Sequence, residues 1–302
     1  MNVYREDGIR VNVFGGLGNQ FFCYFAGKYL SDKLNLKLRV DLTRVNQAQF
    51  NIGSSLDDFE LSDPVVNSIN FPHLGVHQRA ARKIAVNSNK ILNFPLTFNG
   101  EYISSGLGFE VNLNRIRKPV VLTSYFQSYK YFDSLSPLDQ SIPSLKGNGS
   151  LAYKLLLKKV REEQPVVIHF RRGDYIKHKN SFGNLGRYYY ENAYNHLPEK
   201  FQSKICWVFS DDLQTAKAVL SDVLPSNTFW VDPNSELSAA QTLHVMTFGS
   251  GYIIANSTFS YWGAKFNPSE PYVIAPTKWF KNLTDPLDLI PPYWHTSASY
   301  WD

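Results

Sequence analysis

Apolar runs alternate with amphipathic stretches along the second half of the chain. Short runs rich in valine, isoleucine and aromatic residues predict buried strands. These runs cover residues 165–170, 204–210, 227–231, 252–256 and 272–276. Residues 213–224 lie between two of them and carry apolar side chains at three- and four-residue steps, which predicts a helix. The alternation of strands with helices predicts a parallel, doubly wound sheet.

The first half of the chain repeats this α/β pattern. It predicts strands at 9–14, 36–41 and 119–126, and a helix from about Phe21 to Leu34. Residues 134–150 are rich in Ser, Pro and Gly, which is typical of a boundary between domains. A chain of 302 residues is long enough for about two domains. We therefore expect an N-terminal domain over 1–150 and a C-terminal domain over 151–302.

Composition narrows the class of protein without selecting a function. Hydrophobic residues make up 43% and charged residues 19%, as in ordinary globular proteins, and the aromatic share of 15% is compatible with glycan binding. The net charge of +5 favours an anionic partner. No zinc-finger or RNA-binding signature supports a nucleic-acid partner.

Cys23 and Cys206 lie in apolar stretches and are expected to be buried thiols. Without a long apolar run, a cytoplasmic protein is expected.

Polar clusters follow three of the predicted strands. Arg171, Arg172 and Asp174 come after the first, Asp211 and Asp212 after the second, and residues 256–264 after the fourth. In doubly wound sheets, ligands bind beyond the carboxyl ends of the strands. We therefore expect the three clusters to meet at one edge of the sheet.

The paired arginines suggest phosphate binding, because a guanidinium directs two donors toward phosphate oxygens. Side chains alternate in an extended segment, so Arg171 and Arg172 should point in opposite directions. One would meet the ligand and the other would pair with Asp174. A purely structural ion pair is the alternative for this cluster.

The remaining polar groups each allow two interpretations. The glycines of "GGLGNQ" (15–20) either bring backbone close to a ligand or form a tight turn into a helix, and Asn19 either caps that helix or binds the ligand. The hydroxyls of "NSTFS" (256–260) either bind an anion at a helix N-terminus or cap the helix. Asp211 and Asp212 either accept hydrogen bonds from a base or ribose, or cap the helix that begins at Leu213.

Six motifs in order resemble the α-1,2-fucosyltransferase family. They are "GGLGNQFFCYFAGKYL", "YFQSYKYF", "HFRRGDY", "FSDD", "IIANSTFSYWGA" and "IAPTKWF", and they run from about residue 11 to residue 280. The resemblance implies an α/β fold of GT-B type, with two Rossmann-like domains that face a central cleft. It also implies GDP-fucose as donor substrate, no cofactor, no metal, and inversion at the anomeric carbon. The N-terminal domain would bind the acceptor and the C-terminal domain GDP-fucose.

The same resemblance suggests roles for individual residues. Arg171 and Asn19 would be catalytic, with Arg171 on the β-phosphate and Asn19 facing the donor sugar. The GDP-fucose site would further comprise Gly15, Gly16, Gly18, His169, Arg172, Asp174, Asp211, Asp212, Ser257, Thr258 and Ser260. A fixed cation near the departing phosphate would stabilise charge that develops in the transition state. No general base is assigned, because several acids could serve.

The expected acceptor is a glycan that ends in galactose, attacked through its 2-hydroxyl, in bacterial surface-polysaccharide or O-antigen synthesis. It could be carried on a lipid at the inner face of the cytoplasmic membrane. The basic clusters at 79–83 and 115–118 are either solvated faces or surfaces that help the protein approach that membrane. Two alternatives from other classes are a glycan-binding module without turnover and a dinucleotide oxidoreductase. The second lacks the full glycine fingerprint.

Overall fold

The computed structural model describes residues 7–45, 56–66, 76–91, 95–173, 176, 179–232 and 236–302. The chain divides into two compact units. Unit 1 comprises 1–144 together with 286–289, and unit 2 comprises 145–285 together with 290–302. The division at Ser144 falls within the segment rich in Ser, Pro and Gly. No helix in the described ranges combines the length and apolar character that a membrane span requires.

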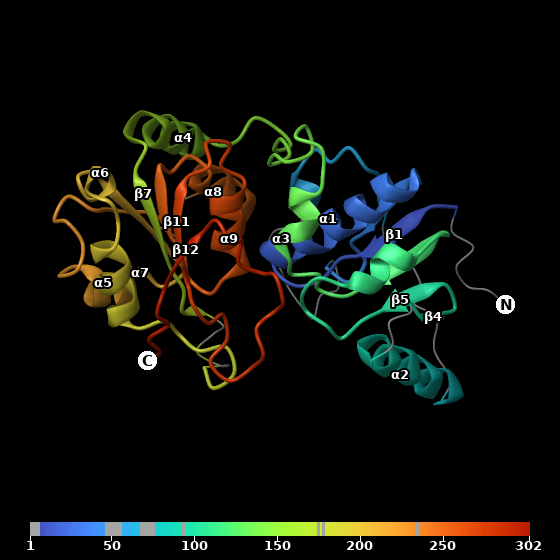
Figure 1. Cartoon of the computed structure of the whole chain (residues 1–302). Coiled ribbons are helices and arrows are strands. Elements are labelled where there is room, and N and C mark those ends of the chain that lie inside the picture. Colours follow the sequence, from blue (N-terminus) through green and yellow to red (C-terminus); the bar gives the residue numbers. More distant parts are fainter. Residues whose placement is uncertain are drawn as a thin grey trace. The chain divides into compact units, whose positions relative to one another are not determined.

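Unit 1 is built on a six-stranded sheet with the order β3-β2-β1-β6-β5-β4. Its strands are β1 (Ile9–Asn12), β2 (Leu38–Asp41), β3 (Val65–Val66), β4 (Thr97–Phe98), β5 (Glu101–Ile103) and β6 (Val120–Thr123). Its helices are α1 (Leu17–Leu34), α2 (Val76–Ile91) and α3 (Tyr129–Asp133), with 3-10 turns at Leu56–Asp58 and Val111–Arg115. All pairs are parallel except β4 with β5. Helices α1 and α3 pack together, and α2 contacts β4 and β5 (Figure 1).

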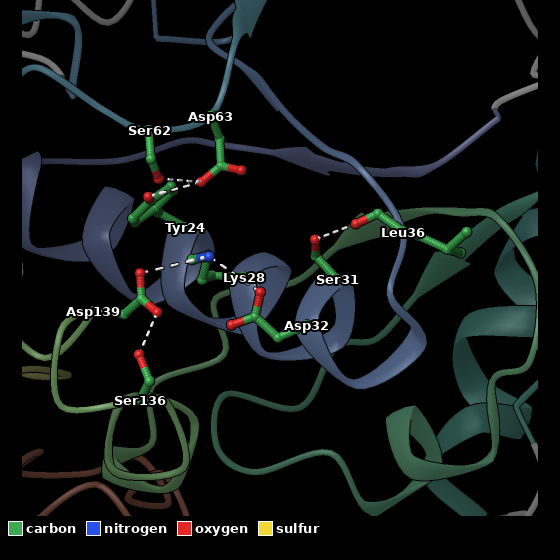
Figure 2. Close-up of polar contacts among 9 residues, drawn as sticks. All are labelled: Tyr24, Lys28, Ser31, Asp32, Leu36, Ser62, Asp63, Ser136 and Asp139. Atoms are coloured by element: carbon green, nitrogen blue, oxygen red, sulfur yellow. Dashed lines mark hydrogen bonds and ion pairs between the residues drawn. The ribbon is translucent and has the colours of Figure 1, made fainter.

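Helix α1 is the main support of this sheet. Most of its first half is buried, and it ends at Asn35, whose left-handed backbone (φ 51°) stops the helix. Polar contacts fasten neighbouring segments to it (Figure 2). The Lys28 ammonium lies 3.1 Å from Asp32 and 3.5 Å from Asp139, and the Tyr24 hydroxyl donates to Asp63 at 3.0 Å. These contacts keep the segments around Asp63 and Asp139 against the helix that begins with the glycine-rich loop.

Unit 2 contains a second six-stranded sheet with the order β12-β11-β10-β7-β8-β9. Its strands are β7 (Val166–Phe170), β8 (Cys206–Ser210), β9 (Phe229–Trp230), β10 (Gly251–Ile253), β11 (Tyr272–Pro276) and β12 (His295–Ser297), all parallel. Its helices are α4 (Leu151–Glu163), α5 (Arg187–Asn195), α6 (Glu199–Gln202), α7 (Leu213–Leu220), α8 (Ala239–Met246) and α9 (Thr258–Lys265). Helices α4, α8 and α9 lie on one face of the sheet, and α5, α6 and α7 on the other (Figure 1).

Burial on both faces explains why the strands of unit 2 are continuous apolar runs. All five residues of β7 and of β8 are buried. Val166, Ile168 and Phe170 project to the same face and pack in a core that includes Tyr189 and Tyr190 of α5. The two free cysteines are buried, as predicted, and burial raises the pKa of each thiol to about 12. The predicted α/β class with parallel, doubly wound sheets is confirmed.

Candidate functional site

Strand order places the polar clusters of unit 2 at a single point. The chain runs from β7 to β8 and β9 on one side, then returns to build β10, β11 and β12 on the other side of β7. The order therefore reverses between β7 and β10, and ligands of open α/β sheets bind at such a reversal. The polar residues that follow β7, β8 and β10 stand at the carboxyl ends of three adjacent parallel strands. Their predicted convergence is confirmed.

The two arginines after β7 point in opposite directions, as predicted for an extended segment. The Arg171 guanidinium is about one-quarter exposed and forms an ion pair with Asp211 at 2.8 Å. Arg172 is buried, donates to the Leu185 carbonyl at 3.2 Å and forms an ion pair with Asp302. Arg172 thus stabilises the base of the loop, while Arg171 lies at the surface of the carboxyl edge. Asp174, the predicted partner of one of the two arginines, lies outside the described residues.

Asp211 is the link between β7 and β8 at this edge. One carboxylate oxygen accepts the backbone N–H of Arg172 at 2.9 Å, and the other binds the guanidinium of Arg171. Gly173 has a left-handed backbone (φ 20°), and a Cβ added there would lie 2.1 Å from the Asp211 carboxylate. A side chain at this position would push Asp211 away. The glycine of "HFRRGDY" is therefore needed for Asp211 to reach both arginines.

Asp212 caps helix α7. Its carboxylate accepts the backbone N–H of Thr215 at 3.0 Å and the Thr215 hydroxyl at 2.6 Å. Hydrogen bonds from the Thr215 hydroxyl and backbone lower the pKa of the Asp212 carboxyl. Of the two interpretations of this aspartate, the cap is thus present in the structure, and contact with guanosine stays a prediction for both Asp211 and Asp212.

His169 is the last polar side chain of β7 and is buried beside the carboxyl edge. Burial, aided by the positive charge of Arg171, lowers its pKa to about 3. The imidazole is therefore neutral at physiological pH. Its ring lies 6.1 Å from that of Phe259, and Nδ1 accepts or donates no hydrogen bond among the described residues. His169 can hydrogen-bond or stack with a ligand but cannot supply a charge to a phosphate.

The loop after β10 leads into helix α9. Ser257 is the residue before the first turn and makes no side-chain cap hydrogen bond, and Thr258 is half-buried. Ser260 is fully buried, and its hydroxyl donates to the Ser257 carbonyl at 3.2 Å. Asn256 fastens the loop, because its amide donates to the carbonyls of Phe182 and Trp279 at 3.1 Å each. Ser257 and Thr258 are better placed than Ser260 to reach an anion.

Unit 1 carries its own reversal of strand order, between β1 and β6. The segment Gly15–Gln20 follows β1 and enters helix α1 at Leu17, and Gly15 adopts a left-handed backbone (φ 77°) in which a Cβ would lie 2.9 Å from Asn19 Nδ2. Gly16 is exposed and a Cβ there would meet nothing within 4 Å, whereas Gly18 is buried in the first turn of α1. Gln20 holds the loop, because its amide donates to the Gly15 carbonyl at 2.9 Å.

Sequence reasoning missed one residue of this edge. Gln127 follows β6, is buried, and donates from Nε2 to the Asn19 Oδ1 atom at 2.8 Å. It lies within "YFQSYKYF". Because Gln127 follows β6, the strand next to β1, knowledge of the strand order would identify it as a candidate. Within the described ranges, no group of three or more His, Cys, Asp or Glu residues is arranged to hold a metal ion.

Comparisons with known proteins agree with one another. The family model described as glycosyl transferase family 11 matches residues 115–285. An α-1,2-colitosyltransferase of Escherichia coli is 27% identical over 93% of this chain and 95% of its own length. The O-antigen biosynthesis glycosyltransferase WbnK of Escherichia coli is 30% identical over 88% of this chain and 93% of its own length.

A solved structure supports the fold. POFUT1 in complex with GDP-fucose superposes with a TM-score of 0.50 at 12% identity, over 89% of this chain and 97% of that one. At this identity the likeness bears on fold alone, and it confirms the predicted GT-B-type α/β architecture. The predicted cleft between the two domains stays a prediction.

Proposed function

The chain belongs to glycosyl transferase family 11, and on that premise we propose that it transfers L-fucose from GDP-β-L-fucose to the 2-hydroxyl of a terminal galactose. In this proposal GDP binds at the strand reversal of unit 2. The observation that carries it is Arg171, a partly exposed cation at the carboxyl end of β7, oriented by Asp211. The glycosyltransferase activity itself follows from the family.

Arg171 is proposed to stabilise the departing diphosphate. Cleavage of the bond between fucose and GDP leaves negative charge on the β-phosphate, so a cation fixed nearby stabilises the transition state more than the ground state. Arginine can hold a carboxylate with one edge of its guanidinium and a phosphate with another, because it presents five N–H donors. The ion pair with Asp211 fixes the guanidinium before the donor arrives, which reduces the cost of ordering it.

The remaining predicted residues receive proposed roles according to their surroundings. Ser257 and Thr258 stand at the N-terminus of α9, where backbone N–H groups favour an anion. The neutral His169 would contact the nucleoside, and Arg172 and Ser260 would support the site from the interior. Asn19 and the Gly15–Gln20 loop, at the edge of unit 1, would contact the sugars.

We propose an inverting, metal-independent reaction, since a cationic side chain can supply the charge stabilisation that a divalent ion supplies in other transferases. The proposed acceptor belongs to bacterial O-antigen synthesis, an assignment supported by the name of the WbnK relative. A lipid-linked acceptor at the inner face of the cytoplasmic membrane is part of this proposal.

A second donor is suggested by the relative that is named an α-1,2-colitosyltransferase. Colitose differs from fucose by the absence of the 3-hydroxyl, so both donors share GDP, the 6-methyl group and the anomeric centre. A site that hydrogen-bonds a hydroxyl discriminates strongly against a substrate that lacks it. Comparing kcat/KM for GDP-fucose and GDP-colitose with the same galactoside decides between the two donors.

The role of Arg171 is tested by replacing it with alanine. Loss of the guanidinium removes stabilisation of the leaving group, and we expect kcat to fall by about 100-fold or more, a fall comparable to the loss of one oxyanion-stabilising donor. Arg187→Ala is the matched control, since Arg187 is also an ion-paired arginine of unit 2, bound to Glu191 and Asp222. We expect the control to retain wild-type turnover.

The measurement is release of GDP with a galactoside acceptor, together with the thermal unfolding midpoint of each variant. Near-normal turnover of a folded Arg171→Ala protein would remove this residue from the mechanism. Equal losses in Arg171→Ala and Arg187→Ala would point to damage to unit 2 in general.

A further inference from the structure

Two loops meet at the strand reversal of unit 1. β1 and β6 are adjacent and parallel, with Val11 opposite Leu122, so the residues that follow them emerge side by side. At the last position of each strand, the Asn12 amide donates to the Thr123 hydroxyl at 2.8 Å. The loop that begins at Gly15 and the turn that contains Gln127 therefore lie together at the edge where ligands of such sheets bind.

Asn19, in the first turn of α1, and Gln127, in the turn after β6, form a hydrogen-bonded amide pair. Gln127 Nε2 donates to Asn19 Oδ1 at 2.8 Å. Gln127 is 6% exposed, and its Oε1 accepts no hydrogen bond from any described residue. The Asn19 Nδ2 group donates to none of them either, as far as the described chain extends. The pair thus leaves one carbonyl oxygen and one NH₂ group for a ligand.

The backbone of this turn is strained in a way that fixes Gln127. Phe126 has φ 51°, a left-handed conformation that bulky residues rarely adopt, and its side chain is fully buried. Hydrogen bonds hold the turn, because Gln127 N–H donates to the Leu107 carbonyl and Ser128 N–H donates to the Phe126 carbonyl at 2.8 Å. Strained residues persist where the surroundings enforce them, and they cluster at ligand sites.

The chemistry of the pair fits a hydroxyl group. A hydroxyl both donates and accepts a hydrogen bond, so an N–H donor beside a C=O acceptor satisfies it fully, whereas a phosphate or carboxylate would be repelled by the carbonyl oxygen. Both amides are neutral. Phe14 and Tyr125 follow the same two strands, β1 and β6, and their half-buried rings pack edge to face with centroids 4.7 Å apart. Aromatic walls with a few oriented polar groups are typical of small-ligand sites.

We propose that Asn19 and Gln127 bind a sugar hydroxyl at the strand reversal of unit 1, with Gln127 acting twice. Its Nε2 holds the Asn19 carboxamide in the orientation that presents Nδ2, and its Oε1 accepts a hydrogen bond from the sugar hydroxyl. The sugar is either the donor fucose or the acceptor galactose, an identification that rests on the proposed function. A buried carbonyl oxygen without a protein partner is costly, and the sugar hydroxyl is what satisfies it.

The test uses Gln127→Ala and Gln127→Glu in the full chain. Alanine removes both functions. Glutamate keeps the shape but cannot donate to Asn19 Oδ1, so the Asn19 amide must turn its NH₂ toward the new carboxylate. We expect kcat/KM to fall about 10- to 100-fold in both variants, the range that loss of a buried hydrogen bond to substrate gives. Gln140→Ala is the control, because among the described residues the Gln140 amide donates to the carbonyls of Asp133 and Leu135, away from Asn19.

Two arms identify which sugar supplies the hydroxyl. If it belongs to the donor, the variants raise the KM for GDP-fucose and slow its hydrolysis in the absence of acceptor. If it belongs to the acceptor, they raise the KM for the galactoside and leave donor hydrolysis at the wild-type rate. Wild-type kinetics in both variants, or a lowered melting temperature with unchanged kinetics, overturns the proposal and leaves Gln127 a structural residue.

A binding measurement separates this inference from the proposed function. The side-chain amide resonances of Gln127, assigned by their loss in Gln127→Ala, are followed while GDP-fucose or the galactoside is titrated. A shift with either one supports the site even where no transfer occurs. An active wild-type enzyme whose Gln127 resonances respond to neither compound contradicts the hydroxyl site alone, whereas absence of turnover contradicts the proposed function.

Discussion

Asp211 contacts both arginines of "HFRRGDY", one through its side chain and the other through its backbone. Its carboxylate binds the Arg171 side chain and the Arg172 backbone, so a single acid positions the exposed cation and closes the turn. Arg172 is directed inward by a separate set of partners, Leu185 and Asp302. Exposed ion pairs contribute little to stability, about 0–1 kcal/mol. The main effect of the Arg171–Asp211 ion pair is therefore to orient the Arg171 guanidinium.

His169 predicts a specific dependence of stability on pH. Its pKa in the folded protein is about 3, below the value of about 6.5 in an unfolded chain. Between these values the unfolded state binds a proton that the folded state does not, so stability falls as the pH falls below about 6.5. From pH 7 to pH 5 the contribution of His169 is a loss of about 2 kcal/mol.

Urea unfolding at pH 7 and pH 5 measures this effect. We expect His169→Gln, which cannot titrate in this range, to lose less stability on acidification than the wild type. His196→Gln, at an exposed histidine of the same unit, should behave as the wild type. The explanation fails if His169→Gln and the wild type lose stability equally.

At the scale of elements, helix α1 illustrates how packing overrides propensity. Gly27 lies in its middle, where alanine would normally favour the helix by about 1 kcal/mol. A Cβ at Gly27 would, however, lie 2.9 Å from side-chain atoms of both Val11 and Leu38. Because Val11 is a β-branched residue fixed in the central strand, it cannot move aside easily. The glycine lets α1 approach the sheet.

We therefore expect Gly27→Ala to destabilise the protein by about 1–3 kcal/mol, as overpacking of a core does. Gly263 in α9 is the matched control, since the nearest atom to a Cβ there would be Met246 Cβ at 3.1 Å, a looser contact than the two at 2.9 Å that a Cβ at Gly27 would make. Chemical denaturation of both variants gives the ranking. A Gly27→Ala protein as stable as Gly263→Ala would contradict the close helix–sheet contact.

Sequence patterns predict the long buried strands and fail to predict several strands of only two or three residues. β7 and β8 were evident because both of their faces are covered. β3 and β4 contain two residues each, and their extended conformation depends on pairing with β2 and β5, respectively. The sequence pattern predicts that α1 begins at about Phe21, whereas the helix begins at Leu17. Gly18 and Asn19 are poor helix formers, so their sequence favours a loop at these positions.

In the candidate site, too, some features follow from local sequence and others depend on the tertiary fold. The alternation of Arg171 and Arg172 follows from the geometry of one extended segment and could be predicted locally. The partner of Arg172 is 130 residues away in the sequence, and the partner of Asn19 is 108 residues away. Such pairs depend on strand order, which no local pattern encodes. The contact between Gln127 and Asn19 therefore follows only from the position of β6 beside β1.

At the scale of the whole molecule, each unit places its candidate residues at its own strand reversal. Both sheets grow outward from a first strand, then return to its other side, and in both the polar loops follow the two strands at the reversal. The polar groups differ in kind. Unit 2 presents a cation and a helix N-terminus, whereas unit 1 presents neutral amides and aromatic rings. This difference suits a nucleoside diphosphate in unit 2 and a sugar in unit 1.

If unit 2 binds the nucleoside diphosphate, GDP should stabilise the folded protein against thermal unfolding. A ligand that binds only the folded state stabilises it by about 2.7 kcal/mol at 100 times its Kd. For a chain of this size each kcal/mol raises the melting temperature by about 2–4 °C. We expect saturating GDP to raise the midpoint of the transition that includes unit 2 by about 5–10 °C in differential scanning calorimetry.

ADP and NAD are the controls, because both contain a pyrophosphate but neither contains guanine. If the site recognises guanosine as proposed, they should protect much less than GDP at equal concentration. EDTA should leave the protection by GDP unchanged, since Arg171 and the N-terminus of α9 supply the positive potential without a divalent ion. Equal protection by all three nucleotides would reduce the site to a pyrophosphate site. Loss of protection in EDTA would mean that a metal ion, and not Arg171 alone, balances the diphosphate.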